Sequence, residues 1–355
     1  MLRNTEFNFI KTILINLGQE IIRMKKHIFL FILFSYQSFA NNAINPSNPK
    51  SSDEEQVIVY GVRPGPELWR VTNDTDGENE LWILGTLSLL PKRMDWHSEL
   101  VETVIEDSQV LLLPPTAEAD IGFFKKLSLV TSFIGIKKNP DGKQLKDIVP
   151  KELYARWLVL KKKYMGRDRS IEKTRPIFAS QELFNKAIKK TGLIYDTKVL
   201  KKIRKLAKKH KLQFITPTID LDIKKPKAAI RKFKKSEIND LECFSTTLDR
   251  LEVDINTMRL RADAWANGDI STIKELKYPD QIVSCGNAFL NSDVVQDTDM
   301  KDIVPRLKKA WVEAAVKSLQ QNKSTFAILP MRDLMGKNSL LDELAKLGYS
   351  IKIPK

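Results

Sequence analysis

Ser88 and Asp333 are the two residues whose positions could support chemistry, because each follows a short apolar run that predicts a buried strand. The first run is Leu81–Leu84, and Ser88 comes after the turn that ends it. The second run is Thr325–Leu329, which Arg332 and Asp333 follow closely. Functional residues of sheet-and-helix folds gather at the carboxyl ends of strands. We therefore expect Ser88, Arg332 and Asp333 to face one another across adjacent strand ends.

Two kinds of catalysis could use this set, and one structural interpretation competes with them. A serine nucleophile needs a base within hydrogen-bond distance, and Asp333 would be a weak base with no histidine to complete a triad. A carboxylate metal site could instead combine Asp333 with Asp95. In the structural interpretation, Ser88 caps its turn while Asp333 and Arg332 pair at the surface.

Histidine is scarce in this chain, which argues against an imidazole metal site. Only three histidines are present, and two of them, His97 and His210, follow the N-terminal segment that we expect to be removed. His97 lies at a predicted helix start, and His210 ends a lysine-rich stretch whose charge would repel a cation. Catalytic zinc sites draw on several converging imidazole, thiolate or carboxylate ligands. We therefore predict no metal and no cofactor.

The elements that must position these residues are strands near both chain ends and helices between them. Short apolar runs predict the strands, and helical spacing of apolar residues predicts the helices. The predicted strands are Val57–Tyr60, Leu68–Thr72, Leu81–Leu84, Val110–Leu113, Gln213–Thr216, Thr325–Leu329 and Tyr349–Ile353. The predicted helices are Trp96–Asp107, Asp147–Lys163, Phe178–Lys190, Thr197–Lys209, Asp240–Ala266, Lys301–Gln320 and Ser339–Leu347. This order predicts an α+β fold, with a small central mixed sheet built from both chain ends and a large helical middle.

The N-terminal region predicts export. Met24 opens a short cationic stretch, apolar Ile28–Phe34 follows, and Ser38–Ala40 supplies the small residues that a signal peptidase reads. We expect cleavage after Ala40 and localisation in the periplasm or outside the cell, with an uncleaved anchor as the alternative. No later apolar segment is long enough to cross a membrane. The expected division of the chain is an untranslated or upstream extension at 1–23, a signal peptide at 24–40, a flexible linker at 41–55 and a single domain at 56–355.

Cys243 and Cys285 are the only cysteines of the chain. In an exported protein, a lone pair of cysteines is expected to form a disulfide. A disulfide between them would close a loop of about 40 residues and stabilise the fold by about 4 kcal/mol in the chain-entropy model. Two buried free thiols are the alternative, and a cysteine nucleophile is disfavoured because no histidine lies near either residue in the sequence.

The positive charge of the chain is concentrated in one segment. The formal net charge is +15. Residues 186–235 alone contain about 18 Lys and Arg residues but only three acidic residues. Within this segment, Thr197–His210 is typical of a cationic amphipathic helix, which could bind anionic lipid or a cell-wall polymer. A solvated face above a buried apolar stripe is the alternative, and nucleic acid is not an expected partner because no stacking aromatic cluster is present. The lysines expected to contact an anionic surface are Lys201, Lys202, Lys205 and Lys208.

Several segments, taken in order, resemble the TraB/GumN family, relatives of the Tiki metalloproteases. The resemblance runs over roughly Val57–Ile353, and its central piece is the strand and turn of Leu81–Pro91. It implies a mixed α/β fold and a metal-dependent hydrolase site, in which two Gly-x-x-His motifs and a glutamate converge from strand ends. The other segments that carry the resemblance are Val59–Trp69, Lys173–Pro176, Arg261–Asp269 and Leu340–Ile351.

All three ligand positions that the resemblance implies are changed in this chain. The first Gly-x-x-His motif becomes Gly85 with Ser88, the second becomes Pro330 with Asp333, and the glutamate position falls at Leu113. We therefore predict that the implied metal-hydrolase site is lost and that the protein has a non-catalytic binding role in the periplasm. The alternatives are a hydrolase with a site rebuilt around Ser88 and Asp333, and a basic protein that binds an anionic membrane or cell-wall surface.

Three further residues of the resemblance have expected structural roles. Trp265 and Gly268 should fix and pack the end of a helix. Arg175 precedes Pro176 at a predicted helix start. Both a site arginine and a structural pairing with an acid are open for Arg175.

Overall fold

A central sheet is built from strands at both ends of the chain. The computed structural model describes residues 65–73, 79–119, 129–195, 198–276, 281–296, 298–335, 338–352 and 354, which all belong to one structural unit. The strands among them are β1 (Leu68–Asn73), β2 (Glu80–Thr86), β3 (Leu89–Pro91), β4 (Val110–Leu112), β5 (Thr116–Ala119), β6 (Leu193–Tyr195), β7 (Gln213–Ile215), β8 (Thr218–Leu221), β9 (Ser324–Pro330) and β10 (Tyr349–Lys352).

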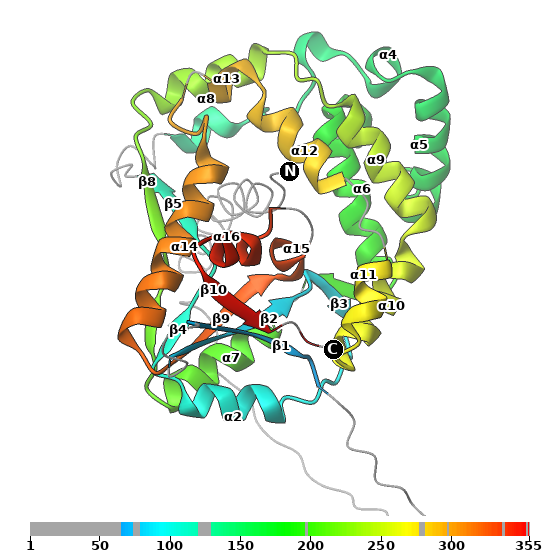
Figure 1. The fold of residues 1–355 in the computed structure, drawn as a ribbon. Helices are drawn as coiled ribbons and strands as arrows, with labels where there is room; N and C mark the ends of the chain where they lie inside the picture. The colour runs from blue at the N-terminus through cyan, green and yellow to red at the C-terminus, as the bar shows by residue number, and fades with distance from the viewer. Residues whose placement is uncertain are drawn as a thin grey trace, which may run out of the picture. The chain divides into compact units, whose positions relative to one another are not determined.

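In the described residues, six strands form one mixed sheet in the order β10–β1–β2–β9–β4–β7 (Figure 1). β1 is antiparallel to β10 and to β2, whereas β2, β9, β4 and β7 are all parallel to their neighbours. Two small sheets accompany it, β3 with β6 and β5 with β8. The predicted fold class is thereby confirmed: a mixed sheet from both chain ends, with a helical middle.

Helices cover the sheet and form most of the middle of the chain. Among the helices of the described residues, none is both long and apolar enough to cross a membrane. They are α2 (Glu99–Asp107), η1 (Val130–Phe133), η2 (Pro140–Gly142), α4 (Leu145–Ile148), α5 (Lys151–Tyr164), η3 (Ser170–Lys173), α6 (Pro176–Lys190), α7 (Lys198–Lys209), α8 (Pro226–Lys235), α9 (Leu241–Val253), α10 (Ile255–Ala266), α11 (Ile270–Glu275), α12 (Gln281–Leu290), α13 (Asp293–Gln296), α14 (Ile303–Gln321), α15 (Met331–Leu334) and α16 (Leu340–Lys346).

The main hydrophobic core lies on the two faces of the central sheet. β9 is buried over nearly its whole length, as expected of a strand with parallel neighbours and helices on both faces. In Figure 1, α2 and α7 lie below the sheet, and α15 and α16 lie above it. Trp69, Trp265 and Trp311 are almost fully buried in this core. Burial of each large apolar side chain stabilises the fold by roughly 1.5–3 kcal/mol.

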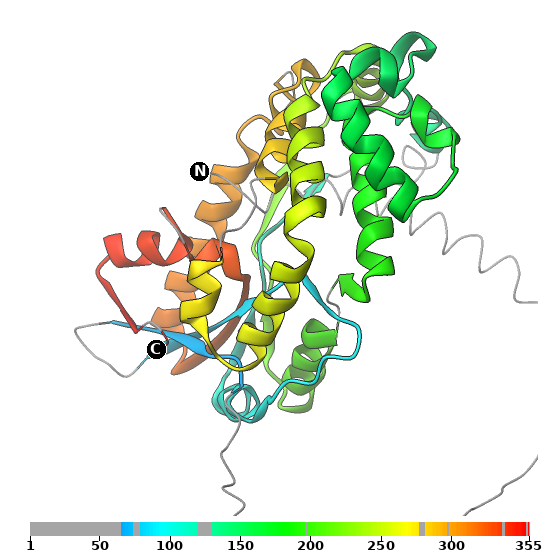
Figure 2. The same cartoon turned by 90° about the vertical axis from the view of Figure 1, so that its right-hand side faces the viewer.

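A second core holds the helical middle together. α5, α6 and α9 pack side by side (Figure 2), and the Trp157 and Phe244 rings meet at 5.4 Å between them. A buried ion pair lies at this core, with Lys161 Nζ 2.6 Å from Glu172 Oε1. The indole N–H of Trp157 also donates to Glu172 Oε1, at 3.3 Å. The carboxylate is therefore paired and hydrogen-bonded, as a buried charge requires.

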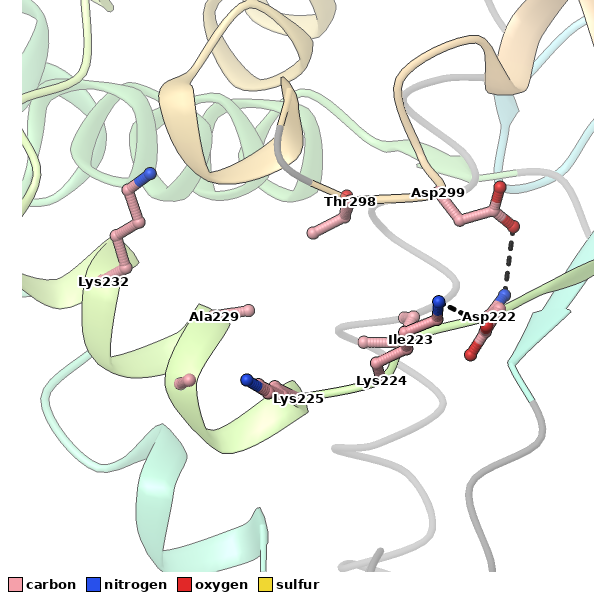
Figure 3. Close-up of a pocket in the computed structure, with 9 residues that line it drawn as sticks. Asp222, Ile223, Lys224, Lys225, Ala229, Lys232, Thr298 and Asp299 are labelled. Carbon is pink, nitrogen blue, oxygen red and sulfur yellow. Dashed lines mark hydrogen bonds and ion pairs between the residues drawn. The ribbon is translucent and has the colours of Figure 1, made fainter.

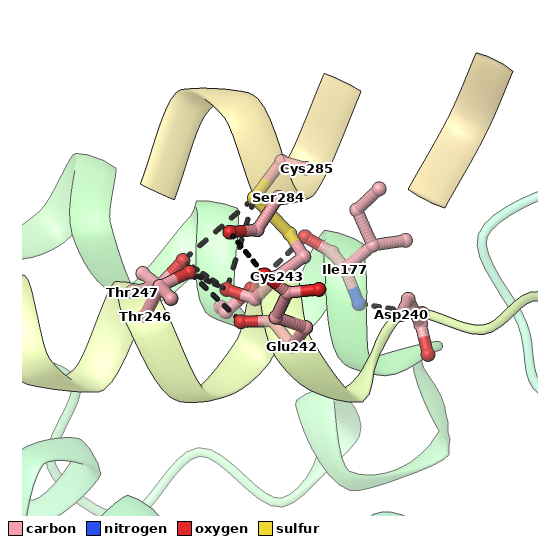
Figure 4. The surroundings of a disulfide bond; sticks show 9 residues. Ile177, Asp240, Glu242, Cys243, Thr246, Thr247, Ser284 and Cys285 are labelled. Atoms are coloured by element: carbon pink, nitrogen blue, oxygen red, sulfur yellow. Dashed lines mark hydrogen bonds between the residues drawn. A yellow bond between two sulfur atoms is a disulfide. The ribbon is translucent and has the colours of Figure 1, made fainter. Parts of the chain in front are cut away.

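The two cysteines meet between α9 and α12 (Figure 4). The sulfur atoms of Cys243 and Cys285 lie 2.02 Å apart, which is disulfide distance. Both residues are buried, and Thr247 Oγ1 donates to the Cys243 carbonyl at 2.7 Å. The structure therefore brings together the two cysteines that the sequence predicted to pair. This pair links α12 to α9 in the helical core.

Two helices that were predicted as single elements are interrupted, so those predictions were wrong in extent. Asp147–Lys163 is divided into α4 and α5 because Pro150, whose ring cannot continue a helix, precedes α5. Asp240–Ala266 is divided into α9 and α10 at Asp254. The carboxylate of Asp254 accepts from Arg261 Nη2 at 2.7 Å and from Arg250 Nε at 3.4 Å. The spacing of apolar residues, from which the helix was predicted, carries no information on this ion-pair cluster.

Several short elements were not predicted from the sequence. β3, β5, β6 and β8 have three or four residues each, and such short runs lack a clear periodic signal. The strand predicted at Val57–Tyr60 lies outside the described residues, as do the extension, signal peptide and linker predicted for residues 1–55. The other predicted strands and helices are confirmed within a few residues of their ends.

Candidate functional site

The ends of β2 and β9 form the candidate site, and they lie side by side. The two strands are parallel, with Gly85 opposite Leu329 and Thr86 opposite Pro330. Thr86 Oγ1 donates to the Leu329 carbonyl at 3.2 Å and links the two ends. The glycine position of the first motif and the proline position of the second therefore lie at neighbouring strand ends.

Gly85 lies in a tightly packed part of the strand end. A Cβ atom at this position would come within 2.8 Å of Met331 Sδ and 2.9 Å of the Trp69 ring, so a larger residue would require both side chains to move. The indole N–H of Trp265 donates to the Gly85 carbonyl at 2.6 Å. The space beside Gly85 is thus filled by large buried side chains, which could not be predicted from the sequence.

Ser88 and Asp333 differ in their surroundings. Ser88 is exposed in the turn between β2 and β3, whereas Asp333 is half-buried on α15. Among the described residues, no hydrogen bond joins the two side chains, and the expected face-to-face arrangement stays a prediction. Burial raises the pKa of Asp333 to about 6, although the charges of Arg332 and Lys308 lower it. Raised carboxyl pKa values occur both at functional sites and at buried structural positions.

The third motif position, Leu113, lies directly after β4 and is buried in the main core. Its backbone N–H donates to the Ile215 carbonyl at 2.8 Å, so the residue extends the pairing of β4 with β7. One exposed hydroxyl, one aliphatic side chain and one carboxylate therefore occupy the three positions. This set does not fit the imidazole and carboxylate ligands that the resemblance implies.

The remaining metal-ligand candidates are spread over the described part of the molecule. His97 precedes α2, with Nδ1 3.9 Å from Glu99 Oε2, and His210 follows α7, with Nδ1 3.9 Å from Glu106 Oε1. Asp95 is exposed in the loop before α2. Across the described residues, no three His, Cys, Asp or Glu side chains are arranged to hold a metal ion.

Trp265 and Gly268 have the structural roles expected of them. The Trp265 ring packs on the Trp96 ring at 5.6 Å, directly behind the end of β2. Gly268 follows α10 with φ of 74°, and a Cβ atom there would lie 2.7 Å from the Gly65 carbonyl oxygen. Asp269 then caps α11 by accepting from the Thr272 hydroxyl at 2.6 Å and from the Thr272 N–H at 2.8 Å, and these hydrogen bonds lower its pKa to about 2.

Arg175 is buried and binds backbone carbonyls. Its guanidinium donates to the carbonyls of Ser236 at 2.8 Å, Phe233 at 2.9 Å and Lys234 at 3.0 Å, and to that of Lys138 at 3.1 Å. Three of these acceptors belong to the C-terminal end of α8. Arg175 therefore joins the start of α6 to the end of α8, which the sequence alone could not reveal.

The lysines predicted to contact an anionic surface lie along α7. Lys201, Lys202, Lys205 and Lys208 are all exposed. The apolar stripe of α7 is buried in the main core through Val199, Ile203 and Ala207. Lys202 Nζ lies 2.8 Å from Glu102 Oε1 on α2 and 5.3 Å from the centre of the Trp96 ring. The lysines are accessible, but the stripe beneath them is not.

Comparison with known proteins gives one match. The model of the TraB/PrgY/gumN family matches residues 68–353, which is most of the chain. A search of curated proteins and a search of solved structures each found no match.

Proposed function

Because the chain belongs to the TraB/PrgY/gumN family, we propose that it is an exported member that has lost the metal-hydrolase chemistry and acts by non-catalytic binding in the periplasm. The side chains at the three motif positions are the observation that carries this proposal. Ser88, Leu113 and Asp333 stand where the resemblance implies two imidazoles and a carboxylate, and Leu113 is buried in the main core. Such a set lacks the converging ligands that a catalytic metal site needs.

Metal analysis of the purified protein tests the loss of the hydrolase site. Protein prepared without chelator should carry far less than one equivalent of zinc, manganese or cobalt. Adding any of these ions should not raise the unfolding temperature, because a ligand that binds only the folded state must stabilise it. Stoichiometric metal that survives dialysis would overturn the proposal.

A hydrolase rebuilt around Ser88 and Asp333 is the second candidate. The observation that favours it is the raised pKa of Asp333, which is about 6 and places this carboxyl within reach of general acid–base chemistry at neutral pH. Ser88 is exposed and could approach a substrate. Peptide and ester substrates should be screened against the protein and against Ser88→Ala and Asp333→Ala. An activity that both substitutions abolish would favour the enzyme over the binding protein.

The third candidate is binding to an anionic membrane or cell-wall surface. Exposed lysines on α7 support it, and export would bring the protein to such surfaces. A disulfide-distance cysteine pair is compatible with an oxidising compartment. Substitution of Lys201, Lys205 and Lys208 by glutamine should weaken binding to anionic vesicles at low salt. Binding that ignores both the substitutions and the salt concentration would exclude this role.

A further inference from the structure

A hollow at the start of α8 lies away from the strand ends described above. Its volume is about 720 Å³, and it is bounded by the segment before α8, the first turns of α8 and the loop after α13. Figure 3 shows Lys224, Lys225 and Lys232 along one side, with Thr298 and Asp299 across from them. Ala228 and Ala229 on the helix leave the space open. Volumes of this size are typical of sites for small molecules.

The segment that forms one side of the hollow is strongly cationic. Residues 224–235 contain seven Lys or Arg and no acid. The backbone amides at the start of α8 add a partial positive charge to this field. Lys224 and Lys225 are both exposed, so a ligand that enters the hollow from solvent can contact their ammonium groups.

The two carboxylates that line the hollow are already engaged. Asp299 accepts from the Asp222 N–H at 3.0 Å and from Arg306 Nη1 at 3.1 Å, and its pKa is lowered first by the Asp222 N–H and then by Arg306. Asp222 Oδ2 lies 3.9 Å from Lys224 Nζ. Each carboxylate therefore has a cation beside it, and the excess charge of the lining is positive.

We propose that this hollow binds a small ligand through a phosphate-type anionic group. Lysine ammonium groups bind phosphate as point charges with several donors each, and three of them border one space of suitable size. The ligand is either a soluble phosphorylated molecule or the head group of an anionic phospholipid. This site is separate from the strand ends, so it stands whether or not the proposed loss of hydrolase chemistry is correct.

Binding of inorganic pyrophosphate at low salt, measured by isothermal titration calorimetry, tests the soluble source. The variant is Lys224→Gln with Lys225→Gln and Lys232→Gln. The matched control is Lys146→Gln with Lys151→Gln and Lys162→Gln on α4 and α5, which removes the same formal charge from exposed lysines that do not line the hollow. The first variant should bind about tenfold or more weakly, and the control should bind within about threefold of the unmodified protein.

Vesicle flotation tests the lipid source, with phosphatidylglycerol vesicles compared with phosphatidylcholine vesicles. Loss of binding in the α8 variant alone, for pyrophosphate or for phosphatidylglycerol, supports the site and identifies its source. A third variant with arginine at the same three positions keeps the charge and should retain most of the binding. No binding of either probe, or an equal loss in both glutamine variants, would overturn the proposal. Unfolding curves of all variants separate a loss of binding from a loss of the fold.

Discussion

α7 and the segment 224–235 that ends in α8 carry equal charge but are held by the fold in different ways. Each has twelve residues with seven Lys or Arg and no acid. α7 buries Val199, Ile203 and Ala207 in the main core, whereas Phe233 is the one buried residue of α8. α7 is therefore part of the scaffold of the sheet, and α8 is attached to the helical middle at few points.

The neighbours of the two helices also differ. α7 runs beside α2, which contributes the carboxylates of Glu102 and Glu106. The pKa of Glu102 is lowered, first by its hydrogen bond with Lys202. α8 instead contacts η1, which contains no acid, and α13, which contains Asp293. Lys224 and Lys232 also have partners, Asp222 Oδ2 at 3.9 Å and the Asp293 carbonyl at 3.4 Å. Both segments therefore contain engaged lysines, and they differ in which elements supply the partners.

The attachment of α8 through Phe233 gives the largest predicted effect. The Phe233 ring lies 6.4 Å from that of Phe178 and 6.0 Å from that of Phe289. Phe233→Ala should lower the free energy of unfolding by about 3–5 kcal/mol, since it removes both contacts and leaves a cavity. Urea denaturation measures the loss, and an exposed substitution on the same helix, Lys227→Ala, should cost less than about 0.5 kcal/mol.

Ile203→Ala on α7 provides the comparison for Phe233→Ala. It should also be costly, at about 2–5 kcal/mol, but Val199 and Ala207 remain in the core to hold the helix. Hydrogen exchange should then show faster exchange of α8 amides in Phe233→Ala and preserved protection of α7 in Ile203→Ala. Equal protection of α8 before and after the Phe233 substitution would contradict the proposed difference in attachment.

Arg175 is the second point of attachment for α8, and its removal should have a smaller effect. Arg175→Ala leaves the carbonyls of Phe233, Lys234 and Ser236 without their donor. A loss of about 2–4 kcal/mol is expected, because unsatisfied polar groups in the interior are costly. Arg231→Ala, on the exposed side of α8, is the matched control. Similar unfolding midpoints for the two variants would argue against a clamp at Arg175.

Most of the sheet could be predicted from the sequence, because its strands are apolar runs that end at turn residues. Leu81–Leu84 and Thr325–Leu329 are confirmed as parts of β2 and β9. The break at Asp254 could not be predicted, since Arg250 and Arg261 reach it only in the folded chain. Apolar periodicity reports burial along one element and carries no information on ion pairs between elements.

The candidate site could be predicted only in its position along the chain. The adjacency of Gly85 and Pro330 followed from strand order, but the placement of Met331 against Gly85 depends on side-chain packing. The sequence does not distinguish Lys224 and Lys232 from Lys201, because the density of lysines along the chain is the same in both segments and does not predict a hollow. Lys224 and Lys232 line one hollow only because the loop after α13 closes its other side in the folded chain.

Acidification should act in opposite directions through two carboxyl groups, Asp240 before α9 and Glu102 on α2. Asp240 is buried beside Ile177, and its pKa is raised to about 6 by that burial, with Arg175 acting against the rise (Figure 4). A raised carboxyl pKa means that the folded state binds the proton more tightly, so this group makes the protein more stable as pH falls from 7 towards 4. Asp240→Asn should therefore stabilise the protein at pH 7 by roughly 1–2 kcal/mol and have little effect at pH 4. Urea midpoints at both pH values measure this, and a uniform shift would show that ionisation is not the cause.

Glu102 tests the α7 side and gives the smallest predicted effect. Its pKa is lowered by Lys202, so the stability that it contributes is present above its unfolded pKa and lost as pH falls through the folded value. The pair is 43% exposed on each side, so Glu102→Gln should cost only about 0.2–1 kcal/mol at pH 7, and less in high salt. The same substitution uncovers Lys202 and should raise vesicle binding through α7, while pyrophosphate binding at α8 should stay unchanged. If Glu102→Gln raised pyrophosphate affinity as well, the anion site would not be confined to α8, and the distinction between the two helices would fail.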